Sequence, residues 1–140
     1  MRTLLNIKLP AALENLGRWR GAVSECAREQ GFDQRKTGKI ELALEEALVN
    51  ICNYAYPDGP GDVEVSCKED DRRFIIEIVD SGDPFDMTSL PAPDLPPSIE
   101  ERKIGGLGIF LIRKMVDDVR YRRGGNFNIL NLTIQRGEEK

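Results

Sequence analysis

Apolar and polar positions alternate at the start of the chain and then recur at helical spacing. Residues 4–9 alternate well enough for an edge strand, and Pro10 ends that pattern. From residue 11 to about residue 30 the apolar positions recur roughly every three or four residues, until Gly31 ends the pattern. The first part of the chain therefore predicts an edge strand followed by an amphipathic helix.

A second helix and a hairpin are predicted next. Asp33 is suited to cap a helix that continues to about Tyr56, where the proline- and glycine-rich residues 57–61 end it. Two stretches rich in β-branched residues follow, at 63–67 and 73–80, and a polar turn separates them. This alternation is typical of a β-hairpin in the core of a sheet.

Prolines dominate the segment after the hairpin. Five of the eight prolines lie between residues 84 and 97, so this stretch is expected to be neither helix nor central strand. Residues 86–104 are predicted to form a long loop, of the kind that often serves as an active-site lid. A helix is predicted over 107–118, and a last hairpin pairs 119–121 with 127–134.

The order of these elements predicts an α+β fold. We expect one domain over residues 1–140, built as a two-layer α/β sandwich with a mixed sheet of about five strands and about three helices on one face. An apolar content of 40% is sufficient for a core in a chain of 140 residues.

Composition excludes several classes of function. The net charge of −4 argues against direct nucleic-acid binding, and no apolar stretch approaches the ~20 residues of a membrane span. Three widely spaced cysteines and the absence of a signal-peptide pattern fit a cytoplasmic protein without membrane attachment. The chain has no histidine, so a Ser-His-Asp triad, histidine-ligated zinc and a phosphohistidine are all excluded.

Three polar residues share one face of the second predicted helix. Glu46, Asn50 and Asn53 are spaced by four and then three residues, so their side chains stack among apolar neighbours. We expect the three to share one nucleotide-binding site, in which a bound metal and a phosphate chain are their partners. An amide oxygen is a suitable ligand for Mg²⁺, and a carboxylate one turn earlier could accept a proton from an attacking hydroxyl. An exposed pair without a ligand is the alternative on this helix alone.

Asp80 ends the apolar strand 73–80 and is followed by Ser81 and Gly82. A carboxylate in this place can accept a hydrogen bond from the exocyclic amine of a base, and a glycine lets the backbone approach the ring. The alternative is an ordinary Asp-Gly turn at the end of a strand.

The segment Gly105-Gly106-Leu107-Gly108 opens the third predicted helix. Unpaired backbone N–H groups at a helix start favour an anion such as phosphate. The segment lacks the lysine and serine or threonine of a P-loop, and no strand directly precedes it as in a dinucleotide fingerprint. A hinge for the lid is the alternative.

The three motifs, in this order, resemble those of the Bergerat-fold (GHKL, histidine-kinase-like) ATPases, and in particular the small anti-sigma-factor serine/threonine kinases of bacterial partner switching. The resemblance covers about residues 4–134. It implies that Glu46 is the general base and that Asn50 holds Mg²⁺. It also implies that Asp80 and Gly82 bind adenine and that residues 105–108 contact the phosphates of ATP.

This resemblance implies a function as well. We expect an ATP- and Mg²⁺-dependent protein kinase that phosphorylates a STAS-domain anti-anti-sigma protein, sequesters a sigma factor and forms a homodimer. The chain departs from the family at Gly125-Asn126-Phe127-Asn128, where the family often has a Gly-Thr-Thr-like segment. A nucleotide-binding interaction module without turnover is the alternative, in which Glu46 would be dispensable.

Overall fold

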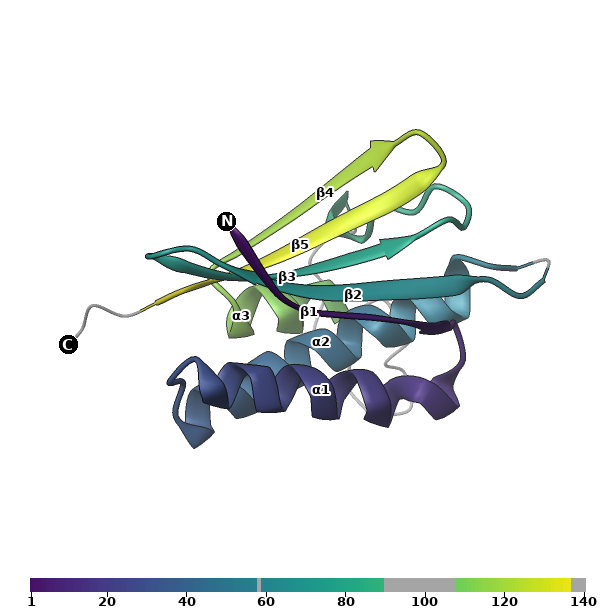
Figure 1. The fold of residues 1–140 in the computed structure, drawn as a ribbon. Helices are drawn as coiled ribbons and strands as arrows, with labels where there is room; N and C mark the ends of the chain where they lie inside the picture. Colours follow the sequence, from purple (N-terminus) through teal and green to yellow (C-terminus); the bar gives the residue numbers. More distant parts are fainter. Residues whose placement is uncertain (58, 90–107, 137–140) are drawn as a thin grey trace, which may run out of the picture.

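The computed structural model describes residues 1–57, 59–89 and 108–136. Figure 1 shows a sheet that lies on a layer of helices, so the predicted two-layer α+β architecture is confirmed. The elements in chain order are β1 (Arg2–Pro10), η1 (Leu13–Asn15), α1 (Leu16–Glu29), α2 (Gln34–Tyr54), β2 (Asp62–Glu69), β3 (Arg73–Asp80), η2 (Met87–Ser89), α3 (Gly108–Met115), β4 (Asp118–Gly124) and β5 (Phe127–Gln135).

The sheet has the strand order β1-β2-β3-β5-β4, and all four neighbouring pairs are antiparallel. The prediction of a mixed sheet is therefore wrong. The connection from β3 through α3 brings β4 back in the same direction as β3, as a helical crossover does. Because β5 inserts between these two strands, β3 and β4 are not neighbours, and each of them pairs with a strand of opposite direction.

The two central strands position the polar residues of the site. On β3 and β5 alternate residues are buried against the helices, including Ile78 and its partner Leu130. The next inward pair along the same register is Asp80 and Asn128, at the end of β3 and near the start of β5. Because alternate residues of a strand face the same side, the row of buried apolar residues on β3 and β5 ends in a buried polar pair.

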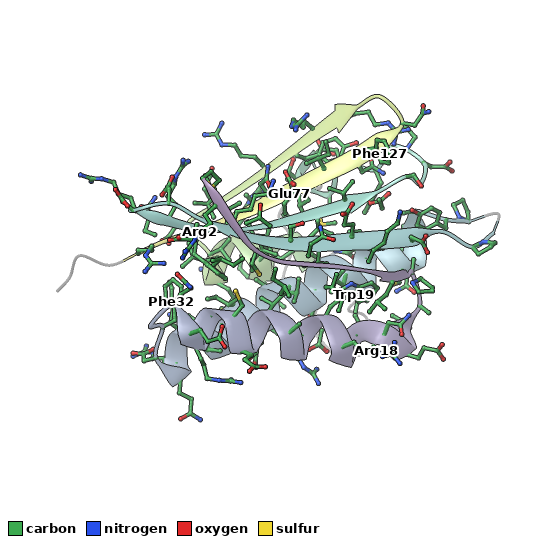
Figure 2. All side chains as sticks on the ribbon, in the orientation of Figure 1. Arg2, Arg18, Trp19, Phe32, Glu77 and Phe127 are labelled. Carbon is green, nitrogen blue, oxygen red and sulfur yellow. The ribbon has the colours of Figure 1, made fainter. Side chains whose placement is uncertain are left out.

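The helices cover one face of the sheet, and α2 lies between α1 and α3 (Figure 1). The Asp33 side chain caps α2 as predicted, by accepting a 2.8 Å hydrogen bond from the backbone N–H of Lys36. Figure 2 shows Trp19 between α1 and the rest of the core, where it is fully buried, whereas Glu77 lies on the opposite face of the sheet.

The first helix differs from the prediction at its start. The predicted single helix over 11–30 is divided into the short η1 and α1, and Leu13, one of the apolar positions of the predicted helix, is 50% exposed. The Asn15 side chain donates to the carbonyl of Pro10 at 2.9 Å, which ties this turn to the end of β1.

The predicted lid at 86–104 and the glycine segment 105–108 fall largely outside the described residues, except for residues 86–89 and Gly108. In the described part of the chain, none of the helices is both long and apolar enough to cross a membrane.

Candidate functional site

Asn50 lies on α2 with only 1% of its surface exposed. Its Nδ2 group is 3.8 Å from the sulfur of Met87, a weak acceptor. Its Oδ1 atom is buried and has no hydrogen-bond partner among the described residues. A buried acceptor left unpaired costs about 1–3 kcal/mol, so this oxygen is a place where a ligand would restore a lost interaction.

The start of α3 lies directly against this amide. A Cβ atom added to Gly108 would sit 2.6 Å from Asn50 Nδ2 and 3.6 Å from Glu46 Oε1. Only a glycine fits here without displacing the Asn50 side chain. The structure therefore brings three of the predicted residues together, namely Glu46, Asn50 and Gly108.

Glu46 is half-buried at this position, one helical turn before Asn50. Burial raises the pKa of its carboxyl group, and the negative charge of Glu45 raises it further. A carboxylate with a raised pKa is a stronger base than an ordinary one while it stays ionised above that pKa. Asn53, in contrast, is exposed near the end of α2, and its predicted role in nucleotide binding stays a prediction.

The donor set around Asn50 fits a magnesium ion that is shared with a phosphate chain. In the described parts of the protein, no group of three His, Cys, Asp or Glu side chains could hold an ion. Mg²⁺ keeps several waters and is commonly held by one or two protein oxygens together with substrate phosphates. One unpaired amide oxygen is compatible with that mode of binding.

Asp80 is 4% exposed at the end of β3. Its Oδ1 atom accepts hydrogen bonds from the backbone N–H of Gly82 at 2.9 Å and from Nδ2 of Asn128 at 2.8 Å. Its Oδ2 atom has no such bond within the described ranges. Burial raises the pKa of Asp80, although the two hydrogen bonds and the positive charge of Arg123 oppose that shift.

Gly82 packs on the C-terminal end of α2. A Cβ atom at Gly82 would lie 2.2 Å from the carbonyl oxygen of Ala55, and the next residue, Asp83, donates its N–H to that carbonyl at 2.8 Å. The absence of a side chain thus allows the chain to turn tightly after Asp80. The predicted approach of Gly82 to a base stays a prediction.

Asn128 is a site residue whose role sequence reasoning left undetermined. It is 4% exposed and bonds Asp80 from the neighbouring strand. The signal that could have found it is the alternation of β5, which places Asn128 on the inward row together with Leu130 and Leu132.

Residues 83–89 connect the two halves of the site. The backbone N–H of Phe85 donates to Asn128 Oδ1 at 3.3 Å, and Met87 contacts Asn50. The site thus has two ends. At the sheet, the Asp80 carboxylate is hydrogen-bonded to Asn128. At the helices, the unpaired amide oxygen of Asn50 lies one turn from the Glu46 carboxylate. Gly105, Gly106 and Leu107 lie outside the described residues, so their contact with phosphate stays a prediction.

Residues 9–134 match the family described as the histidine kinase-like ATPase domain. The chain belongs to this family. The family resemblance predicted from the three motifs is therefore confirmed.

Relatives within this family are protein kinases by name. The chain is 32% identical over 140 residues to the serine-protein kinase RsbW of Halalkalibacterium halodurans, which covers 96% of this chain and 85% of that protein. It is 30% identical over 123 residues to the serine-protein kinase RsbW of Oceanobacillus iheyensis, across 83% of this chain and 77% of the relative.

The fold also has a counterpart among solved structures. The crystal structure of the RsbU and RsbW domains of Rv1364c from Mycobacterium tuberculosis superposes with a TM-score of 0.66 and 19% sequence identity. The match covers 94% of this chain and 32% of that longer chain, so it concerns the fold of one part of it.

Proposed function

We propose that this histidine kinase-like ATPase domain is an ATP- and Mg²⁺-dependent protein serine/threonine kinase and anti-sigma factor. The observation that carries the proposal is the unpaired, buried Oδ1 of Asn50, which lies beneath Gly108 and one turn from Glu46. The serine-protein kinase name of two relatives supports the same reaction class.

Each end of the site has its own part in binding. Asn50 Oδ1 would hold the cation, and the free Oδ2 of Asp80 would accept a hydrogen bond from the amino group of adenine. The backbone N–H of Gly108 would meet the phosphates, and the family resemblance implies the same contact for Gly105, Gly106 and Leu107. When bound, Mg-ATP supplies the phosphoryl group and the positive charge that offsets the phosphate oxygens.

Glu46 acts as the general base. Its carboxylate would accept the proton of a serine or threonine hydroxyl while that oxygen forms a bond to the γ-phosphorus and the bond between this phosphorus and the β–γ bridging oxygen breaks, which releases ADP. Half-burial keeps the carboxylate poorly hydrated, and the raised pKa increases its affinity for this proton. The reaction therefore requires the ionised form of Glu46 at the start of the transfer.

The acceptor protein and the regulatory partner follow from the family resemblance. We expect the substrate to be a STAS-domain anti-anti-sigma protein and the competing partner to be a sigma factor, bound by a homodimer of this chain in the cytoplasm. Transfer of phosphate to the STAS protein would end its competition for this chain and leave the sigma factor sequestered.

The test is transfer of labelled γ-phosphate from Mg-ATP to STAS-domain proteins of the source genome, each purified singly. Wild type is compared with Glu46→Gln and with the control Glu41→Gln on the same helix, whose carboxylate instead accepts a hydrogen bond from the Ser24 hydroxyl on α1. We expect one labelled STAS protein with wild type and the control, and loss of at least ~100-fold in rate with Glu46→Gln.

Two results would contradict the proposal in different ways. If calorimetry shows ATP binding that Asn50→Ala weakens but no STAS protein is labelled, the chain is a nucleotide-binding interaction module without turnover. If Glu46→Gln transfers phosphate as fast as wild type, the assignment of the base is wrong.

A further inference from the structure

The buried Asn128 amide uses both of its ends. Its Nδ2 group donates to Asp80 Oδ1 and to the backbone carbonyl of Asp83, each at 2.8 Å. Its Oδ1 atom accepts from the Tyr121 hydroxyl at 2.5 Å and from the backbone N–H of Phe85 at 3.3 Å. The shortest of these four bonds comes from Tyr121, which lies on the neighbouring strand β4.

These partners determine which way the amide points. The Phe85 N–H can only donate and the Asp83 carbonyl can only accept, so the reversed amide would face a donor with its donor and an acceptor with its acceptor. Tyr121 donates to the same oxygen as Phe85 and polarises the amide. A polarised amide donates more strongly from its nitrogen, because hydrogen bonds in a chain reinforce one another.

Asp80 is the last acceptor in this series of hydrogen bonds, which runs from Tyr121 through Asn128. A hydrogen bond donated to a carboxylate favours its ionised form, which only accepts hydrogen bonds. A protonated carboxyl group would instead donate one. The exocyclic amine at position 6 of adenine needs an acceptor, whereas the carbonyl at position 6 of hypoxanthine needs a donor.

We propose that Tyr121 is a positioning residue that acts through Asn128 to keep Asp80 a hydrogen-bond acceptor, and that it thereby selects 6-aminopurine over 6-oxopurine nucleotides. The inference rests on the proposed function in one respect, namely that a nucleotide base binds at Asp80. It concerns this chain's own departure from the family pattern, since Asn128 stands where a threonine-containing segment is common in the family.

Among the residues that the structure describes, the charge that acts on the pKa of Asp80 is that of Arg123. Arg123 on β4 lowers the pKa of Asp80 by its positive charge, and its guanidinium donates to the carbonyl of Gly82 at 2.9 Å. Asp83 follows on the same loop, and its carbonyl rather than its side chain meets Asn128. Just after α2, the uncharged Tyr56 donates its hydroxyl to the backbone carbonyl of Asp62 and accepts from the backbone N–H of Ser81.

The experiment measures binding of ATP and of inosine triphosphate by calorimetry, which needs no phosphoryl transfer. Tyr121→Phe removes the hydroxyl that bonds Asn128. Tyr56→Phe is the matched control, because among the described residues its hydroxyl bonds Asp62 and Ser81. Both variants are checked by circular dichroism and titrated over a series of pH values, because burial raises the pKa of Asp80 above its ordinary value.

Wild type is expected to bind ATP more tightly than inosine triphosphate and to lose that preference as the pH falls. Tyr121→Phe is expected to reduce the ratio of the two affinities by about threefold to tenfold, because the ionised form of Asp80 loses support. The pH at which ATP affinity is half lost should move upward, since the pKa of Asp80 rises further. Tyr56→Phe should leave the ratio within about twofold.

An unchanged ratio and an unchanged pH midpoint in folded Tyr121→Phe would overturn the inference while leaving the kinase proposal standing. The same loss of preference in both tyrosine variants would also overturn it, because a general loosening of the loop would then explain the effect. A wild-type chain that binds neither nucleotide would overturn the proposed function and this inference together.

Discussion

Asn50 and Asn128 are both buried asparagines of one site, yet their amides differ in how they are satisfied. Both ends of the Asn128 amide are hydrogen-bonded, and the four partners come from β3, from the loop after β3 and from β4. Asn50 has a distant sulfur at one end and no partner at the other within the described residues. The amide at the sheet end of the site is thus fully paired, and the amide at the helix end has one open acceptor.

This difference in hydrogen bonding indicates different roles for the two amides in ligand binding. A fully paired amide holds its neighbours in place before any ligand arrives, which lowers the cost of ordering them on binding. An unpaired amide is unfavourable in the empty protein and becomes favourable only when a ligand supplies the missing partner. We therefore expect Asn128 to hold the site in place and Asn50 to contact the ligand.

The largest expected effect concerns Glu46, at the helix end of the site where we propose that the phosphates bind. Glu46→Gln should lower the rate of phosphate transfer by about 10²- to 10⁴-fold, with ATP affinity changed much less, because the amide cannot accept the hydroxyl proton. In wild type the rate should rise with pH through the pKa of Glu46, which lies above its ordinary value, and should fall below it. Single-turnover rates across pH measure this, and a pH-independent rate would contradict the role of Glu46.

The second prediction compares the two asparagines directly. Asn128→Ala should lower the free energy of unfolding by about 2–4 kcal/mol, since it leaves several buried groups without partners. Asn50→Ala should change it by about 1 kcal/mol or less, because one unpaired oxygen disappears with the side chain. Urea denaturation without nucleotide measures both. Equal losses would show that the two amides do not differ as described.

A third prediction concerns the close approach of α3 to Asn50. Gly108→Ala should weaken ATP binding by about 10- to 100-fold, because the added methyl group would displace the amide that it meets at 2.6 Å. Gly38→Ala on α2 is the control, since its Cβ would meet nothing within 4 Å. Calorimetry with Mg-ATP measures the difference, and unchanged binding in Gly108→Ala would show that Asn50 is not needed in its observed position.

The smallest expected effect separates Asn53 from Asn50. Asn53 is exposed, so Asn53→Ala should change ATP affinity by about threefold at most, whereas Asn50→Ala should weaken it by tenfold or more. The same titration measures both variants. A larger loss with Asn53→Ala than with Asn50→Ala would move the nucleotide contacts toward the end of α2.

Local sequence signals predicted most of the elements, because they depend on neighbouring residues alone. The Asp33 cap, the hairpin of β2 and β3 and the strand end at Asp80 were all expected from residue types and spacing, and the structure has them. The strand directions were predicted less well, since they depend on where β5 inserts among strands that are distant in sequence.

The predicted site residues were found as parts of motifs, and their surroundings were not predictable. The residues of the motif from Glu46 to Asn50 do not predict that Gly108 lies over them, because this contact joins two helices that are far apart in the sequence. The link from Tyr121 through Asn128 to Asp80 likewise crosses three strands, and it requires the register of the sheet.

The amino-acid sequence by itself determined the elements, the family and the residue types available for binding and proton transfer. Periodicity, caps and turns are local, and motif order survives in the chain whatever its fold. Only the tertiary structure decided which of two similar buried amides is paired and which is open. Satisfaction of a buried polar group depends on partners brought from distant segments, and spacing along the chain does not contain that information.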